Sequence, residues 1–177
     1  WYRQMVGISS IGDTTVVTNK WMLGTRNSFF IGICATLLAT SLGTVAALGL
    51  SRPSMPFKGT LMAILISPMI VPLIITSAGM FFFYSKIGLT HSYLGLILAH
   101  TALGTPFVVI TVTATLTGFD TNLIRASQSL GADTLRTFFK VIMPLILPGV
   151  ISGGLFAFIT SFDEVVVVMF IGSVEQI

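Results

Sequence analysis

The sequence predicts an all-α integral membrane protein: a helical bundle with four membrane spans and one polar loop. Of the 177 residues, 54% are hydrophobic and only 8% are charged, whereas soluble domains are about one quarter charged. The charged residues also cluster, and the windows between them are long enough for the roughly 20 apolar residues that a spanning helix needs. We expect residues 1–177 to form a single transmembrane domain.

The spans follow from windows that lack Asp, Glu, Lys and Arg. These windows are residues 27–51, 59–85, 87–119 and 141–162. They predict membrane helices over 27–50, 60–84, 92–117 and 143–162. A further apolar run, 165–174, is too short to cross the bilayer, so it either extends the last helix or re-enters the membrane.

Small residues four positions apart predict where these helices touch, because helices in lipid associate by close packing of small side chains. The pairs are Ala35 and Ala39, Gly43 and Ala47, and Gly149 and Gly153. The alternative is that the glycines are incidental in a chain that holds 17 of them.

Proline pairs interrupt two of the predicted spans, and each proline removes a backbone donor. Pro68 and Pro72 lie in the second span, and Pro144 and Pro148 open the fourth with the same spacing. Kinked helices at membrane depth need protein or a water-filled path to satisfy the freed carbonyls. The prolines therefore indicate either a gate beside a path or kinks that only serve packing.

The polar loop, residues 119–142, is expected to form two short helices joined at Gly131, where a left-handed residue ends the first. Asp120 or Thr121 is placed to cap a helix over 122–130, and Asp133 to cap a second. The second helix has an apolar stripe and is ended by the proline that follows it. The stripe is Leu135, Phe138, Phe139 and Ile142. The first helix is too short to be stable alone, so a partner or the bundle must hold it.

Charge only weakly indicates orientation. The 52–58 and 120–142 loops carry five Lys and Arg, and the other side carries four, Arg3 and Lys20 among them. The positive-inside tendency then places the polar loop in the cytoplasm. The chain begins at Trp1 rather than Met, from which we expect a missing span before residue 1. A second missing span, after Ile177, is an expectation that rests on less.

Few residues suggest chemistry. Asp163 and Glu164 are the acids nearest a span interior, where an ionisable residue is a functional candidate; they would face a cationic solute, or else lie solvated at the outer interface. His91 and His100 are expected to be interface and helix-contact residues. No metal-ligand cluster, nucleophile–base pair or nucleic-acid-binding patch is evident, and there is no GxxxxGK[ST] loop for ATP.

The polar loop resembles the "EAA" loop of binding-protein-dependent ABC importer permeases. The matching residues are Arg125, Ala126, Ser127, Leu130, Gly131, Ala132, Phe138, Ile142, Pro144, Pro148 and Gly149. Arg125 stands where that pattern has Glu, and Ser127 where it has the second Ala. Further similarity covers nearly the whole chain, through Asn27-Ser28, Gly43-Thr44, His100 with Pro106, and Ser161 to Glu164. The pattern is most similar to the second permease subunit of spermidine/putrescine importers.

The resemblance implies a multi-pass subunit of the bacterial inner membrane that normally has six spans. It implies a sister permease, a periplasmic solute-binding protein, and a cytoplasmic ATPase dimer that docks the polar loop. ATP and Mg would then be bound by the ATPase, and this chain would need no cofactor and catalyse no reaction. The alternatives are an ABC permease for another small solute, a stand-alone channel or secondary transporter, and a membrane scaffold without a path.

Overall fold

The computed structural model describes the backbone of residues 14–52, 54–120 and 122–173, with side chains from residue 22 onward. Within these ranges the chain forms helices and connecting turns, and no strand. The helices are α2 (Thr14–Leu50), α3 (Lys58–Ile70), α4 (Leu73–Ile87), α5 (Tyr93–Thr117), α6 (Asn122–Ser129), α7 (Thr134–Thr137), η1 (Phe138–Ile142), α8 (Met143–Asp163) and α9 (Val166–Ile171). The predicted all-α class is confirmed.

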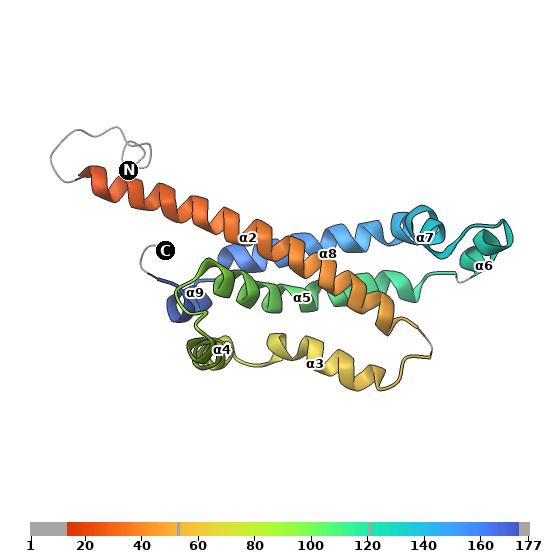
Figure 1. Cartoon of the computed structure of the whole chain (residues 1–177), viewed down its shortest axis with the longest axis horizontal. Coiled ribbons are helices and arrows are strands. Elements are labelled where there is room, and N and C mark those ends of the chain that lie inside the picture. The colour runs from red at the N-terminus through yellow and green to blue at the C-terminus, as the bar shows by residue number, and fades with distance from the viewer. Residues whose placement is uncertain (1–13, 53, 121, 174–177) are drawn as a thin grey trace.

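Three long helices, α2, α5 and α8, lie side by side and form the bundle (Figure 1). Helix α5 is the most deeply buried of them, and its Val108, Val109 and Val112 are 0% exposed. The helices long and apolar enough to cross a membrane cover Met22–Leu50, Tyr93–Thr117 and Thr134–Asp163. These correspond to the first, third and fourth predicted spans.

The second predicted span, 60–84, is not one straight helix; the interruption that its proline pair predicted is a sharp break. Helix α3 ends at Ile70, α4 begins at Leu73, and the two are bent by 104° at the break between them. Val71 is extended, with φ −74° and ψ 135°, because the ring of the following Pro72 disfavours a helical residue before it. The pair can be a fourth span only as a broken or re-entrant one.

The fourth predicted span, 143–162, is the later part of a longer helix. Helices α7, η1 and α8 follow without interruption, so no helix end falls at Pro144, where the sequence analysis placed one. The Met143 N–H donates to the carbonyl oxygen of Phe138 five residues earlier, the spacing of a π turn. This shift of the backbone bonds directly before Pro144 lets the helix continue past a residue that has no N–H to donate.

The apolar run after α8 does not extend it. Glu164 is extended, with φ −82° and ψ 105°, and α9 then forms a separate short helix. Helix α9 packs against α4 and α5, and its Val167 and Ile171 are 0% exposed. These two side chains belong to an apolar cluster that also includes Tyr84 of α4 and Leu96 of α5.

Small residues do form the contacts among the three long helices, as predicted. Ala35, Ala39 and Ala47 of α2 are at most 1% exposed. A Cβ atom added to Gly153 of α8 would lie 2.8 Å from the Cα of Val108 in α5. The helix backbones approach one another too closely there for any larger residue.

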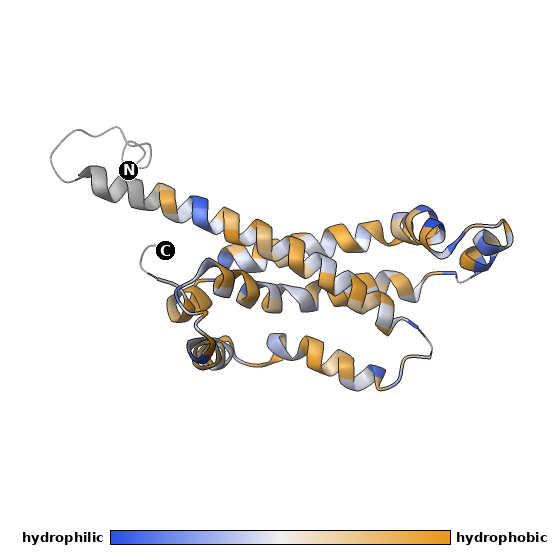
Figure 2. Ribbon diagram, in the orientation of Figure 1, coloured by the Kyte–Doolittle hydropathy of each residue, from blue (hydrophilic) through white to orange (hydrophobic). Residues whose placement is uncertain are grey.

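The outside of the bundle is apolar, as a lipid-facing surface requires. Large hydrophobic side chains are exposed along α2, α4 and α8, for example Leu37 (64%), Phe82 (67%) and Ile159 (59%). Figure 2 shows apolar colour along most of the bundle, with hydrophilic colour at the end formed by α6 and α7 and also on α2, next to its grey part, and on α4. The loop between α2 and α3 lies at that same end (Figure 1).

Candidate functional site

The polar loop folds as two helices because each start is capped and the turn between them is glycine. The backbone N–H of Asn122 donates to Oδ1 of Asp120 (2.9 Å), which starts α6; Thr121, the other predicted cap, lies outside the described residues. Gly131 has φ +82°, a left-handed conformation that is costly for residues with a Cβ. Both predicted features of α6, the cap at Asp120 and the left-handed turn, are confirmed.

Helix α7 starts at the second predicted cap. The backbone N–H of Arg136 donates to Oδ1 of Asp133 (2.8 Å). The two helices are then joined by a hydrogen bond between the hydroxyls of Ser127 and Thr137, whose oxygens are 3.0 Å apart. Thr137 is only 2% exposed, so this bond holds α6 against the start of the long helix.

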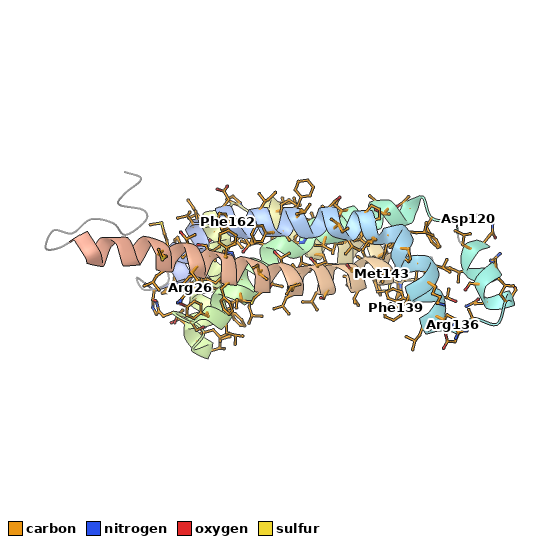
Figure 3. The ribbon with its side chains drawn as sticks, turned by 90° about the horizontal axis from the view of Figure 1, so that it is seen from above. Arg26, Asp120, Arg136, Phe139, Met143 and Phe162 are labelled. Atoms are coloured by element: carbon orange, nitrogen blue, oxygen red, sulfur yellow. The ribbon has the colours of Figure 1, made fainter. Side chains whose placement is uncertain are left out.

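The α6–α7 knob, defined as residues 120–140, presents an apolar surface at the end of the bundle. The exposed fractions are 89% for Leu130, 68% for Leu135 and 64% for Phe139. Figure 3 shows Asp120, Arg136 and Phe139 together at this end of the molecule, far from Arg26 and Phe162 at the other. A short helix pair with such exposed side chains, outside the apolar body of the bundle, is suited to docking another protein.

The loop residues singled out by the sequence all lie in the knob. Arg125 and Ala126 are exposed on α6, whereas Ser127 is half-buried against α7. Ala132 is half-buried beyond the turn, and its N–H donates to the Ser127 carbonyl (3.1 Å). Phe138 is half-buried, with its ring centroid 5.0 Å from that of Phe139. Thr137 was not predicted as a site residue. The exposure of Leu135 and Phe139, on the apolar stripe of the second loop helix, was not predicted either.

The two acids lie at the opposite end, where α8 gives way to α9. Asp163 is the last residue of α8 and is exposed. Glu164 is half-buried, and its Oε1 accepts a hydrogen bond from the Val167 N–H (3.0 Å), which caps α9. Asp163 has no hydrogen bond or ion pair with any other part of the chain that the structure describes. Of the two acids, it is therefore Asp163 whose carboxylate is uncommitted, that is, available to bind another group.

Only one of the four singled-out prolines stands at a break. Pro72 precedes α4 at the bend, whereas Pro68 and Pro148 lie inside continuous helices and Pro144 follows the π turn. The bend is thus the strongest candidate for a hinge in the described chain.

The two histidines make specific contacts that sequence reasoning described only in general terms. His91, with φ +58°, donates its N–H to the Ile171 carbonyl (2.8 Å). Its Nδ1 lies 2.9 Å from the Gly172 oxygen, and because a carbonyl only accepts, Nδ1 carries the proton. His100 is 3% exposed, and its Nδ1 shares a hydrogen bond with Oγ of Ser161 (2.8 Å). A histidine within an apolar run was the one signal that could have pointed to this pair.

Metal chemistry finds no support in the described residues. They contain no group of three or more His, Cys, Asp or Glu side chains that could hold a metal ion. What this arrangement can do is mechanical and electrostatic: a knob for docking at one end and a free carboxylate at the other.

Comparison with known proteins gives one family over most of the chain. The family model described as binding-protein-dependent transport system inner membrane component matches residues 39–176. The chain is 33% identical over 149 residues to the spermidine/putrescine transport system permease protein PotC of Haemophilus influenzae, covering 84% of this chain and 58% of that protein.

Two further comparisons agree. The PotC protein of Escherichia coli K12, of the same description, is 30% identical over 171 residues, which are 93% of this chain and 65% of that protein. The putrescine transport system permease protein PotI of Escherichia coli K12 is 31% identical over 154 residues, which are 81% of this chain and 54% of that protein. The chain therefore spans about half to two thirds of the length of these relatives.

A solved structure shares the fold. The crystal structure of a bacterial ABC transporter involved in the import of the acidic polysaccharide alginate matches with a TM-score of 0.71, at 17% sequence identity. The match covers 89% of this chain and 55% of that chain. At this identity the likeness concerns the fold alone.

Proposed function

Because the chain belongs to the family of binding-protein-dependent transport system inner membrane components, we propose that it is a permease subunit of an ATP-driven importer. In this role the three long helices contribute to a solute path through the bacterial inner membrane. The α6–α7 knob docks on a cytoplasmic ATPase and transmits its movement to the bundle. A sister permease and a periplasmic solute-binding protein complete the assembly.

The observation that supports coupling most directly is the construction of the knob. It exposes Leu130, Leu135 and Phe139, yet it is held firmly by two caps, a glycine turn and the bond between Ser127 and Thr137. A rigid connection is what a force-transmitting contact needs. The continuous helix from Thr134 to Asp163 would carry any displacement of α7 along the whole bundle.

Charge supports the orientation. Arg52 and Lys58 flank the α2–α3 loop, at the same end of the molecule as the knob (Figure 1). Arg125, Arg136 and Lys140 belong to the knob itself. An excess of Lys and Arg marks cytoplasmic loops, so this end faces the cytoplasm and the α9 end faces outward.

The proposed solute is a polyamine, spermidine or putrescine. The names of the related permeases from Haemophilus influenzae and Escherichia coli support it. The uncommitted carboxylate of Asp163 supports it as well, because a carboxylate attracts an alkylammonium group. Asp163 would meet the cation, and Glu164, which caps α9, would shape the local backbone and add negative charge.

Docking is tested at Gly131. Replacing Gly131 with Val forces a β-branched residue into φ +82°, which opposes the turn by about 1–2 kcal/mol and should reorient α6. Co-purification with the ATPase should be lost or greatly weakened. The matched control is Gly118→Val at the same end of the bundle, where φ is −88° and no atom of the described residues lies within 4 Å of an added Cβ. Equal ATPase binding by both variants would contradict docking through the knob.

Solute identity is tested by uptake into vesicles that contain the complete transporter. Labelled putrescine should accumulate only with ATP and the binding protein, and unlabelled spermidine should compete with it. The Asp163→Asn variant should raise the KM for the polyamine and leave ATPase docking unchanged. Uptake that needs no ATPase would favour a stand-alone channel or secondary transporter instead.

A further inference from the structure

The contact between α5 and α8 is close and consists mostly of small side chains. Gly104 of α5 faces Ala157 of α8, and Gly153 of α8 faces Val108 of α5. Most hydroxyls along α5 bond back to their own helix, and none that the structure describes bonds to α8; Thr111 Oγ1, for example, donates to the Phe107 carbonyl (3.0 Å). Contacts between small apolar surfaces bring helices together and set how closely they approach, but such contacts contain no directional bond.

The bond between His100 and Ser161 is the exception. It joins Nδ1 and Oγ over 2.8 Å, and the two residues are 3% and 7% exposed. Among the described residues it is the only hydrogen bond between side chains of α5 and α8. A directional bond at one point favours one rotation and one height of the two helices relative to each other, because a hydrogen bond weakens steeply when it is misaligned.

This bond lies close to the carboxylate that is proposed to meet the solute. Ser161 lies in the last turn of α8, two residues before Asp163. That turn has no further support from Asp163, whose carboxylate is exposed and uncommitted. The same turn also contacts α2, where the Phe162 ring centroid lies 5.0 Å from that of Phe29. The bond to His100 therefore fixes the α5 side of the turn that carries the Asp163 carboxylate.

We propose that His100 is a positioning residue of the solute path: it acts through Ser161 to hold the last turn of α8, so that the Asp163 carboxylate meets an alkylammonium group of the solute. His100 itself does not contact the solute. This inference rests on the proposed function, and it adds a residue from another helix, 61 positions away from Ser161 along the chain.

The second ring nitrogen of His100 makes the proposal sharply testable. Nε2 is buried and has no hydrogen-bond partner among the described residues. The role assigned to His100 needs only Nδ1. The side-chain amide of Asn places a polar atom near the position of Nδ1 and has none near Nε2. The His100→Asn variant should therefore keep the hydrogen bond to Ser161, whereas His100→Leu should lose it.

The experiment measures initial rates of labelled putrescine uptake by the complete transporter in vesicles. His100→Leu and Ser161→Ala should each raise the KM about five- to tenfold, as expected for the loss of one well-aligned interaction, with the maximal rate changed less than about twofold. His100→Asn should retain the wild-type KM. The double variant should be no worse than either single one, because both remove the same bond.

Thr101→Val is the matched control for a purely structural effect. Thr101 neighbours His100 and is 5% exposed, but its hydroxyl bonds to α5 and α2 rather than to α8. It donates to the Ile97 carbonyl (2.7 Å) and, over a longer distance, to the Ala35 carbonyl of α2 (3.5 Å). This variant should change stability without changing the KM. The proposal is overturned if His100→Leu and Ser161→Ala leave the KM unchanged, or if His100→Asn behaves like His100→Leu.

A second measurement separates this inference from the choice of solute. Cys34 is the only cysteine, so Cys34→Ala gives a background for spin labels at Tyr93→Cys on α5 and Asp163→Cys on α8, both exposed positions. The label distance should be narrowly distributed with His100 or Asn at residue 100, and broadened or shifted with Leu. If wild-type transporter takes up no polyamine, the polyamine assignment fails. An unchanged distribution in the Leu variant overturns the positioning role whatever the solute.

Discussion

Replacing Gly153 with Ala is the most direct test of how the bundle is held together. An added Cβ would lie 2.8 Å from the Cα and 3.4 Å from the Cβ of Val108, and it would overlap Oγ1 of Thr111. A side-chain hydroxyl can rotate away, but a backbone Cα can move only if α5 and α8 separate. The added methyl group should therefore destabilise the contact between α5 and α8.

The magnitude follows from two opposing effects. Overpacking of a well-packed contact costs typically about 1–3 kcal/mol, and Ala in a helix interior is favoured over Gly by roughly 0.5–1 kcal/mol. The net expectation for Gly153→Ala is a loss of about 1–2 kcal/mol. At about 2–4 °C for each kcal/mol in a chain of this size, the midpoint of thermal unfolding should fall by several degrees.

The control is Gly79→Ala in α4, where no atom lies within 4 Å of the added Cβ. Only the helix preference acts there, so this variant should be as stable as wild type or slightly more stable. The assay is thermal unfolding of the purified permease in detergent, followed by circular dichroism. If Gly153→Ala matched Gly79→Ala in stability, the close approach of α5 and α8 would be refuted.

Three further predictions concern the two ends of the molecule. Asp133→Ala removes the cap of α7 and should destabilise the knob by about 1 kcal/mol, seen as faster hydrogen exchange in α6 and α7 but not in α5. At residue 91 the backbone has φ +58°, which is unfavourable for Ala but not for Gly. Both His91→Ala and His91→Gly lose the bond to Gly172. His91→Gly should therefore have the higher unfolding temperature, by the equivalent of about 1 kcal/mol. Leu130→Ser removes an apolar side chain that is 89% exposed, so it should weaken ATPase binding and leave the unfolding temperature unchanged; a fall in that temperature would show that Leu130 supports the fold instead.

Much of the fold is determined by local patterns that the sequence displays directly. Apolar windows predict three of the spans because burial in lipid depends on the composition of about 20 neighbouring residues. The turn at Gly131 and the caps at Asp120 and Asp133 were also predictable, since a cap forms between residues only two or three positions apart. The family resemblance likewise rests on a compact motif within the polar loop.

Longer-range features depended on the tertiary structure. A proline shows that a donor is missing, but whether the chain bends by 104° at Pro72 or continues past Pro144 depends on what each helix packs against. Helix α4 turns away where α9 can receive it, and a π turn absorbs Pro144 within the helix.

The same division holds for the candidate sites. The residue types of Asp163 and His100 could be read from the sequence, and both were singled out there. The bond from His91 to Gly172 spans 81 residues and the bond from His100 to Ser161 spans 61, so both were decided only when the helices packed. Local composition determines which segments enter the membrane, whereas hydrogen bonds between distant residues form only where packing brings their atoms to within about 3 Å.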